Sequence, residues 1–127
     1  MSGDDPRHFF FYGTLQSAQS GEAAKLILPK LKRIGAGFIR GRLFLIRAPH
    51  LTYPALLLDD ATEQYVHGAC YEMGSDFSAA DLRFLDAYEE YFPDAPSKSE
   101  YLRQALSVTL ERGTQILAWV YVYNFPL

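Results

Sequence analysis

The chain has 127 residues, of which 49% are hydrophobic and 21% are charged, and its net charge at pH 7 is -3. This composition is that of a globular domain, and the lack of a dense basic patch argues against nucleic acid as a partner. No apolar run is long enough to span a bilayer and the N-terminal end is acidic, so we expect no membrane partner and a cytoplasmic location.

The first predicted elements are a strand and a helix. Residues 8–12 (HFFFY) are dense in aromatic side chains, which favours a short buried strand that ends at Gly13. A helix is predicted near 21–28, with Ser20 as its N-cap and Pro29 as the residue that ends it.

Several short strands follow, and glycine recurs within them. Glycine inside a strand allows a sheet to bend sharply or another backbone to approach closely. A turn at Arg112 and Gly113 joins the last two strands into a hairpin. The predicted strands cover residues 34–46, 54–60, 64–73, 104–111 and 115–123.

These elements predict the fold class α+β, a small mixed sheet that is strongly curved or closed into a β-barrel, with flanking helices. The length predicts one domain over residues 1–127, with 1–7 as a flexible leader. The stretch 93–99 (PDAPSKS) has the composition of a loop.

The helix after Ser78 has the clearest signals. Ser78 is followed three residues later by Asp81, which is the spacing of a capping box at a helix start. A helical wheel then predicts one apolar face formed by four side chains. These are Leu82, Phe84, Leu85 and Tyr88.

Two adjacent glutamates end this helix, and the wheel separates them. Glu89 falls between Leu82 and Leu85, whereas Glu90 falls beside Arg83 and Asp86 on the predicted solvated face. A carboxyl among apolar side chains is desolvated, which raises its pKa and makes Glu89 a candidate general acid and base. The alternative is that Glu89 turns to solvent and pairs with an arginine such as Arg103.

Metal and nucleophile sites have little support in the sequence. Cys70 is the only cysteine, which excludes an internal disulfide and a four-cysteine metal site. The histidines His8, His50 and His67 lack metal-ligand spacing, so we expect no metal. Cys70 is expected to be a small core residue, because His67 would point to the opposite face of the same strand.

Six short motifs, in order along the chain, resemble the γ-glutamylcyclotransferase-like family, in its branch of γ-glutamylamine cyclotransferases and plant defence-induced proteins. The most specific are YGTL, directly after the first strand, and LDAYEE, at the end of the helix. The chain departs from the family at Glu90, where glycine is common, and at Gln16, where a basic residue is common. The motifs are YGTL at 12–15, YPAL at 53–56, HGACYEM at 67–73, LDAYEE at 85–90, YLR at 101–103 and WVYVY at 119–123.

The resemblance implies the residues of an active site. Glu89 takes the position of the family's catalytic glutamate, and the loop of Tyr12, Gly13, Thr14 and Leu15 takes the position that binds substrate. Backbone N–H groups of that loop would hold a carboxylate or a developing oxyanion. Tyr101, which follows the proline-rich stretch, is a further candidate for lining the cavity.

The resemblance also implies the reaction and the partner. In this family the α-amine of a γ-glutamyl amide attacks its own γ-carbonyl, which forms 5-oxoproline and releases an amine without any cofactor. The expected partner is therefore a small γ-glutamyl molecule, and the amine that it carries stays open. The alternatives are a non-catalytic small-molecule binding module of the same fold and a purely structural or interaction domain.

Overall fold

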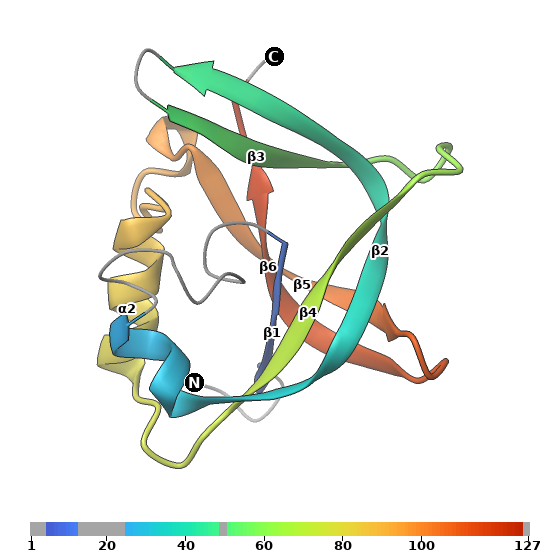
Figure 1. Ribbon diagram of the computed structural model, residues 1–127. Coiled ribbons are helices and arrows are strands. Elements are labelled where there is room, and N and C mark those ends of the chain that lie inside the picture. Colours follow the sequence, from blue (N-terminus) through green and yellow to red (C-terminus); the bar gives the residue numbers. More distant parts are fainter. Residues whose placement is uncertain (1–4, 13–24, 49–50, 126–127) are drawn as a thin grey trace.

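The computed structural model describes residues 5–12, 25–48 and 51–125 (Figure 1). Within these ranges no helix is long and apolar enough to cross a membrane. Six strands form one sheet in the order β3-β2-β4-β1-β6-β5, and a further pairing of β2 with β5 closes five of them into a barrel. The strands are β1 His8–Phe11, β2 Leu31–Ala48, β3 Leu51–Leu58, β4 Tyr65–Met73, β5 Tyr101–Leu110 and β6 Gln115–Tyr123.

The long strand β2 pairs with three other strands, which is why it exceeds its predicted length. Its first part pairs with β4, and its second part, from Gly41 to Ala48, pairs with β3. Within the first part, Gly37 and Phe38 also pair with β5, which closes the barrel. β3 therefore extends from the barrel as an arm with the end of β2, as Figure 1 shows.

Glycine at Gly37 and Gly68 permits the close approaches that the barrel needs. A Cβ atom at Gly68 would lie 2.4 Å from the carbonyl oxygen of Phe11 and 2.9 Å from the Phe10 ring. A Cβ atom at Gly37 would lie 3.0 Å from the carbonyl oxygen of Thr109. The first is closer than real Cβ atoms approach other atoms, so Gly68 sets how tightly β1 can lie against β4.

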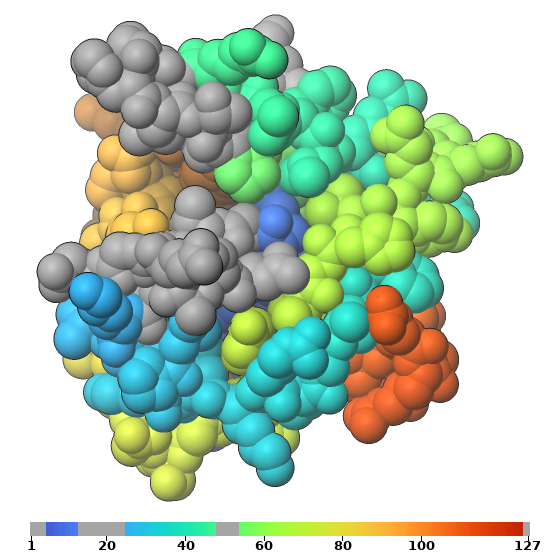
Figure 2. Space-filling view, in the orientation of Figure 1, coloured from blue at the N-terminus to red at the C-terminus, as the bar shows by residue number. Residues whose placement is uncertain are grey.

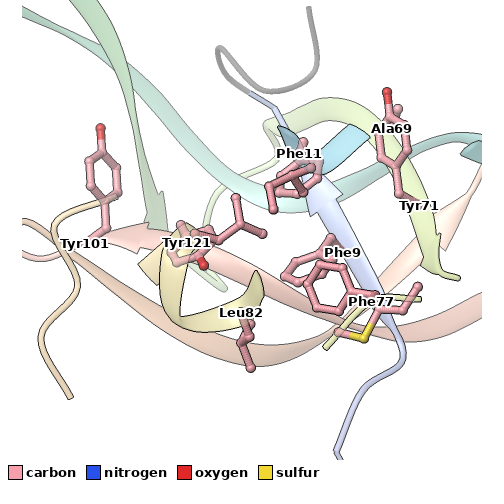
Figure 3. Close-up of a cluster of buried hydrophobic side chains, with 11 residues drawn as sticks. Phe9, Phe11, Ala69, Tyr71, Phe77, Leu82, Tyr101 and Tyr121 are labelled. Atoms are coloured by element: carbon pink, nitrogen blue, oxygen red, sulfur yellow. The ribbon is translucent and has the colours of Figure 1, made fainter. Parts of the chain in front are cut away.

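The alternation of side chains along the strands produces two apolar layers. One fills the barrel with Phe10 of β1 and with Ala118, Val120 and Val122 of β6. The other lies outside the sheet, where Figure 3 shows Phe9 and Phe11 of β1 together with Tyr121 of β6 beneath the helix. Successive residues of one strand thus serve opposite layers, as the period of a strand requires.

The helix α2, Ala79–Tyr88, packs on the outer layer and begins as predicted. Ser78 is its N-cap, and the complete capping box with Asp81 is present. Leu82 and Leu85 are buried against the sheet.

The predicted apolar face of α2 is wrong in part. Phe84 and Tyr88 are 39% and 43% exposed, whereas Asp86, which the wheel placed on the solvated face, is only 5% exposed. The helix buries a narrower stripe than its apolar residues suggest. Asp86 belongs to this buried stripe because Arg103 and Tyr121 on the sheet donate hydrogen bonds to its carboxylate.

Other element boundaries differ by a few residues from those predicted. Of the helix expected near 21–28, residues 25–27 are helical and the 3-10 turn η2 (Leu28–Lys30) follows, while Ser20 and residues 21–24 lie outside the described residues. The stretch 93–99 contains a second 3-10 turn, η3 (Pro96–Lys98). The terminal hairpin is as predicted, except that β5 begins three residues earlier, at Tyr101.

Replacing Gly68 with alanine tests the close approach of β1 to β4. The added methyl must displace the backbone at Phe11, so we expect a loss of at least about 2 kcal/mol in the free energy of unfolding. Chemical denaturation measures it. Glu72→Gln, an exposed change on the same strand, should stay within about 0.5 kcal/mol, and an equally small effect of Gly68→Ala would contradict the packing argument.

Candidate functional site

Glu89 lies at the C-terminal end of α2, on the side of the helix that faces the sheet. It is the C-cap, and its N–H donates to the carbonyl oxygen of Leu85 at 3.0 Å. Glu89 is partly buried, whereas Glu90 is exposed. The two neighbouring carboxyls are thus in the different environments that the wheel predicted for them.

A Schellman motif ends the helix and fixes the backbone around Glu89. The N–H of Glu90 donates to the carbonyl of Ala87 at 3.1 Å, and that of Tyr91 donates to the carbonyl of Asp86 at 2.8 Å. Glu90 has a φ of 55°, the left-handed conformation that glycine adopts most easily. The N–H of Glu100 donates to the carbonyl of Glu90 at 3.0 Å, which ties the motif to the segment before β5.

The environment of Glu89 favours its protonated form. Burial, and to a smaller extent the nearby Glu100 carboxylate, together raise the pKa of its carboxyl from 4.5 to about 7. A carboxyl with this pKa is present in both protonation states near neutral pH. It can therefore accept a proton and return it without a large energy cost.

Tyr12, the first residue after β1, has its hydroxyl close to Glu89. Its O–H donates to the backbone carbonyl of Tyr121. Burial raises the pKa of Tyr12 well above its usual value and the charge of Glu89 adds to this, while a backbone hydrogen bond from Leu56 acts in the opposite direction. In Figure 2 blue atoms of the segment that contains β1 are visible beside yellow-green atoms of β4.

The Tyr121 hydroxyl connects Glu89 with a second carboxyl of α2. It donates to Asp86 Oδ1 at 2.8 Å. Burial raises the pKa of Tyr121 well above its usual value, the Asp86 carboxylate and its hydrogen bond contribute, and the charge of Glu89 contributes as well. Tyr121 therefore lies within reach of the charges of both carboxyls.

Asp86 is paired with Arg103 of β5. Arg103 Nε and Nη2 lie 2.8 and 3.2 Å from the two oxygens of Asp86. Both side chains are largely buried, at 14% exposed for Arg103 and 7% for Asp86. The alternative in which Glu89 pairs with Arg103 is thus not the observed arrangement, because the salt bridge of Arg103 is with Asp86.

Asp86 and Tyr121 are not among the site residues that the sequence predicts. The available signal for Asp86 was its position, four residues after Leu82 and three before Glu89 on the same side of the helix. Tyr121 lies in the WVYVY motif, but that motif does not indicate its partner, which lies 35 residues away along the chain.

The other predicted site residues have different outcomes. Tyr101 is buried, and its hydroxyl donates to the carbonyl of Pro54 at 2.7 Å, which joins the start of β5 to the β3 arm. Gly13, Thr14 and Leu15 lie outside the described residues. The structure thus places the Tyr12 hydroxyl within the electrostatic reach of Glu89 and places Tyr101 beside β3. Among residues 5–12, 25–48 and 51–125, no group of three His, Cys, Asp or Glu side chains could hold a metal ion.

The sequence matches one family model over nearly its whole length. The model described as gamma-glutamyl cyclotransferase, AIG2-like, covers residues 9–126. A search of curated proteins gave no match.

Several solved structures are similar to this one. A mouse AIG2-like protein has a TM-score of 0.66 and 29% sequence identity over 96% of this chain and 80% of its own. A structure named gamma-glutamyl cyclotransferase has a TM-score of 0.69 and 15% identity, and covers 94% of this chain and 68% of its own. An Arabidopsis thaliana protein has a TM-score of 0.62 and 21% identity over 97% of this chain and 73% of its own. The last two establish likeness of fold.

The left-handed conformation of Glu90 predicts that glycine is better at this position. We expect Glu90→Gly to raise the free energy of unfolding by about 1 kcal/mol, because glycine adopts a positive φ without strain. Thermal or chemical denaturation measures it. The matched control is Ala87→Gly, in the last turn of α2, where the same new residue should cost about 1 kcal/mol. Destabilisation by both changes would contradict the argument.

The raised pKa of Glu89 makes stability depend on pH. The folded state holds the proton more tightly than the unfolded state, so this contribution is fully present below pH 4.5 and is lost as pH rises through about 7. We expect Glu89→Gln to stabilise the protein by up to about 3 kcal/mol at pH 8 and to have little effect at pH 4. Urea denaturation at both pH values measures this, with Glu90→Gln as the control. A difference independent of pH would contradict it.

Proposed function

The chain belongs to the gamma-glutamyl cyclotransferase, AIG2-like family, and from this premise we propose that it converts a γ-glutamyl amide into 5-oxoproline and a free amine. Family and fold support gamma-glutamyl cyclotransferase-like activity on a small γ-glutamyl molecule in general. The observation that carries the specific reaction is the partly buried Glu89 carboxyl, whose pKa is raised to about 7.

The reaction rearranges bonds within one molecule. The nitrogen of the α-amine attacks the γ-carbonyl carbon, a C–N bond closes the five-membered ring, and the C–N bond to the departing amine breaks. The attacking nitrogen loses a proton and the departing nitrogen gains one, so no oxidant, reductant or water is consumed. Since the α-amine is mostly protonated at neutral pH, a base must act first.

We assign both proton transfers to Glu89. As a carboxylate it takes a proton from the attacking amine, and as a carboxylic acid it returns a proton to the departing nitrogen. A pKa of about 7 balances the two tasks, because a strongly acidic carboxyl would be a weak base and a strongly basic one would release its proton poorly.

The remaining predicted residues receive roles by the same proposal. Backbone N–H groups of Gly13, Thr14 and Leu15 would hold the α-carboxylate or the oxyanion that develops on the γ-carbonyl. Tyr12 would fix the start of that loop, because its hydroxyl bonds to the Tyr121 carbonyl. Tyr101 would line the cavity with its ring, since its hydroxyl already donates to Pro54.

The departure from the family at Glu90 is consistent with this assignment. Although the side chain is not glycine, the backbone at Glu90 adopts the left-handed conformation and completes the Schellman motif. The helix end that positions Glu89 therefore does not require glycine at the next residue.

The proposal is tested by measuring 5-oxoproline released from a panel of γ-glutamyl amides. We expect Glu89→Gln to lower turnover at least about 100-fold, because it removes the group that exchanges protons. Glu90→Gln, which changes the adjacent and exposed carboxyl, should retain nearly full activity.

Two results would count against the proposal. Retained turnover in folded Glu89→Gln protein would remove Glu89 from the chemistry. Thermal stabilisation by γ-glutamyl amides without any product from the unmodified protein would favour the binding module instead.

A further inference from the structure

We propose that Asp86 is a positioning residue for Glu89: by binding Arg103 it keeps the guanidinium group from pairing with the Glu89 carboxyl, which stays available for proton exchange. This inference rests on the proposed function, in which Glu89 must change its protonation state. It assigns a role to an ion pair that the reaction itself does not use.

The two carboxyls are close enough to compete for one cation. Asp86 and Glu89 are three residues apart at the end of α2, a separation that places their Cβ atoms about 5–6 Å from each other. Asp86 is buried and Glu89 is partly buried on the side of the helix that faces the sheet. A guanidinium next to one of them is therefore within electrostatic reach of the other.

Arg103 is held on Asp86 by contacts from several elements. Its Nε and Nη2 donate to the two Asp86 oxygens, which is the bidentate geometry that arginine forms best. Its guanidinium carbon lies 4.1 Å from the centre of the Trp119 ring and 5.7 Å from that of Tyr91. These contacts fix the direction of its donors toward Asp86.

Tyr121 completes the arrangement between the two carboxyls. Its O–H donates to Asp86 Oδ1, the oxygen that also accepts from Arg103 Nε. Its pKa responds to Asp86 and Glu89 in one direction and to Arg103 in the other. Arg103 and the Tyr121 hydroxyl therefore share one oxygen of Asp86, the carboxyl three residues before Glu89.

The charged and titratable groups around Glu89 can be named by element. Burial is the larger cause of the raised pKa of Glu89, and the charge of Glu100, which precedes β5, is the smaller one. The hydroxyls of Tyr12 after β1 and Tyr121 on β6 lie near it. Arg103 on β5 is the cation that pairs with Asp86, the carboxyl three residues before Glu89 on the same helix end. Without Asp86, this cation would act on Glu89 alone.

Three variants test the proposal through the charges that they remove. We expect Asp86→Asn to lower the pKa of Glu89 by about one to two units, because Arg103 is left without its carboxylate. Arg103→Gln should raise the Glu89 pKa, because the Asp86 charge is then uncompensated. The double variant, which removes both charges, should return it to within about half a unit of the unmodified protein.

The measurement is a carbon-13 NMR titration of the Glu89 carboxyl in each folded variant, together with the pH profile of kcat/KM. A merely structural ion pair would change stability and leave the Glu89 midpoint where it is. Asp59→Asn is the matched control, because it removes one carboxylate from the exposed pair with Arg42 on the β2–β3 arm. It should leave the midpoint unchanged.

Asp86→Asn leaves a buried arginine unpaired, which is strongly destabilising, so the test does not depend on this variant being folded. If it is unfolded, Arg103→Gln and the double variant decide the matter, and an unchanged Glu89 midpoint in Arg103→Gln would overturn the proposal. An unchanged midpoint in folded Asp86→Asn, or an equal shift in the double variant, would overturn it as well.

The test separates this inference from the proposed function, because the titration needs no turnover. If the midpoints shift as expected but no γ-glutamyl amide is converted by the unmodified protein, the proposed reaction is wrong. The effect of Asp86 and Arg103 on the pKa of Glu89 is then still supported. If turnover depends on Glu89 but the midpoints do not respond, only the role of Asp86 is overturned.

Discussion

The burial of the Glu89 carboxyl near a group of the same charge, Glu100, is the constraint on which the site depends. The end of α2 places two carboxyls on the side that faces the sheet, and their surroundings have opposite effects on the charged form. Asp86 receives two donors from Arg103 and one from Tyr121, whereas Glu89 faces Glu100, a group of the same charge. Pairing lets a buried carboxylate stay ionised, while burial beside a like charge favours the proton.

The fold supplies the positions for this contrast. β1 and β6 lie side by side in parallel, so the end of β1 brings the Tyr12 hydroxyl to the Tyr121 carbonyl. The Tyr121 side chain points from β6 into the outer apolar layer, toward α2 (Figure 3). The Schellman motif at Glu90 then ends the helix at a point where the charge of Glu89 acts on the hydroxyls of both tyrosines.

The features that the sequence predicted correctly rest on local patterns. The capping box of Ser78 and Asp81 sets the helix start, and the glycine-rich strands indicate a curved or closed sheet. The different environments of Glu89 and Glu90 also follow from the helical period. The burial of Asp86 did not follow, because its partners lie 17 and 35 residues away along the chain, and local periodicity treats a charge as solvated. Similarly, the length of β2 depends on its pairing with both β4 and β3, which are distant in sequence.

The most direct test of this account is a carbon-13 NMR titration of the Glu89 side-chain carboxyl in the unmodified protein. The account predicts a midpoint of about 7, because the carboxyl is desolvated and lies near Glu100. A midpoint close to the ordinary value of 4.5 would mean that Glu89 is solvated or paired with a cation, and would contradict the account.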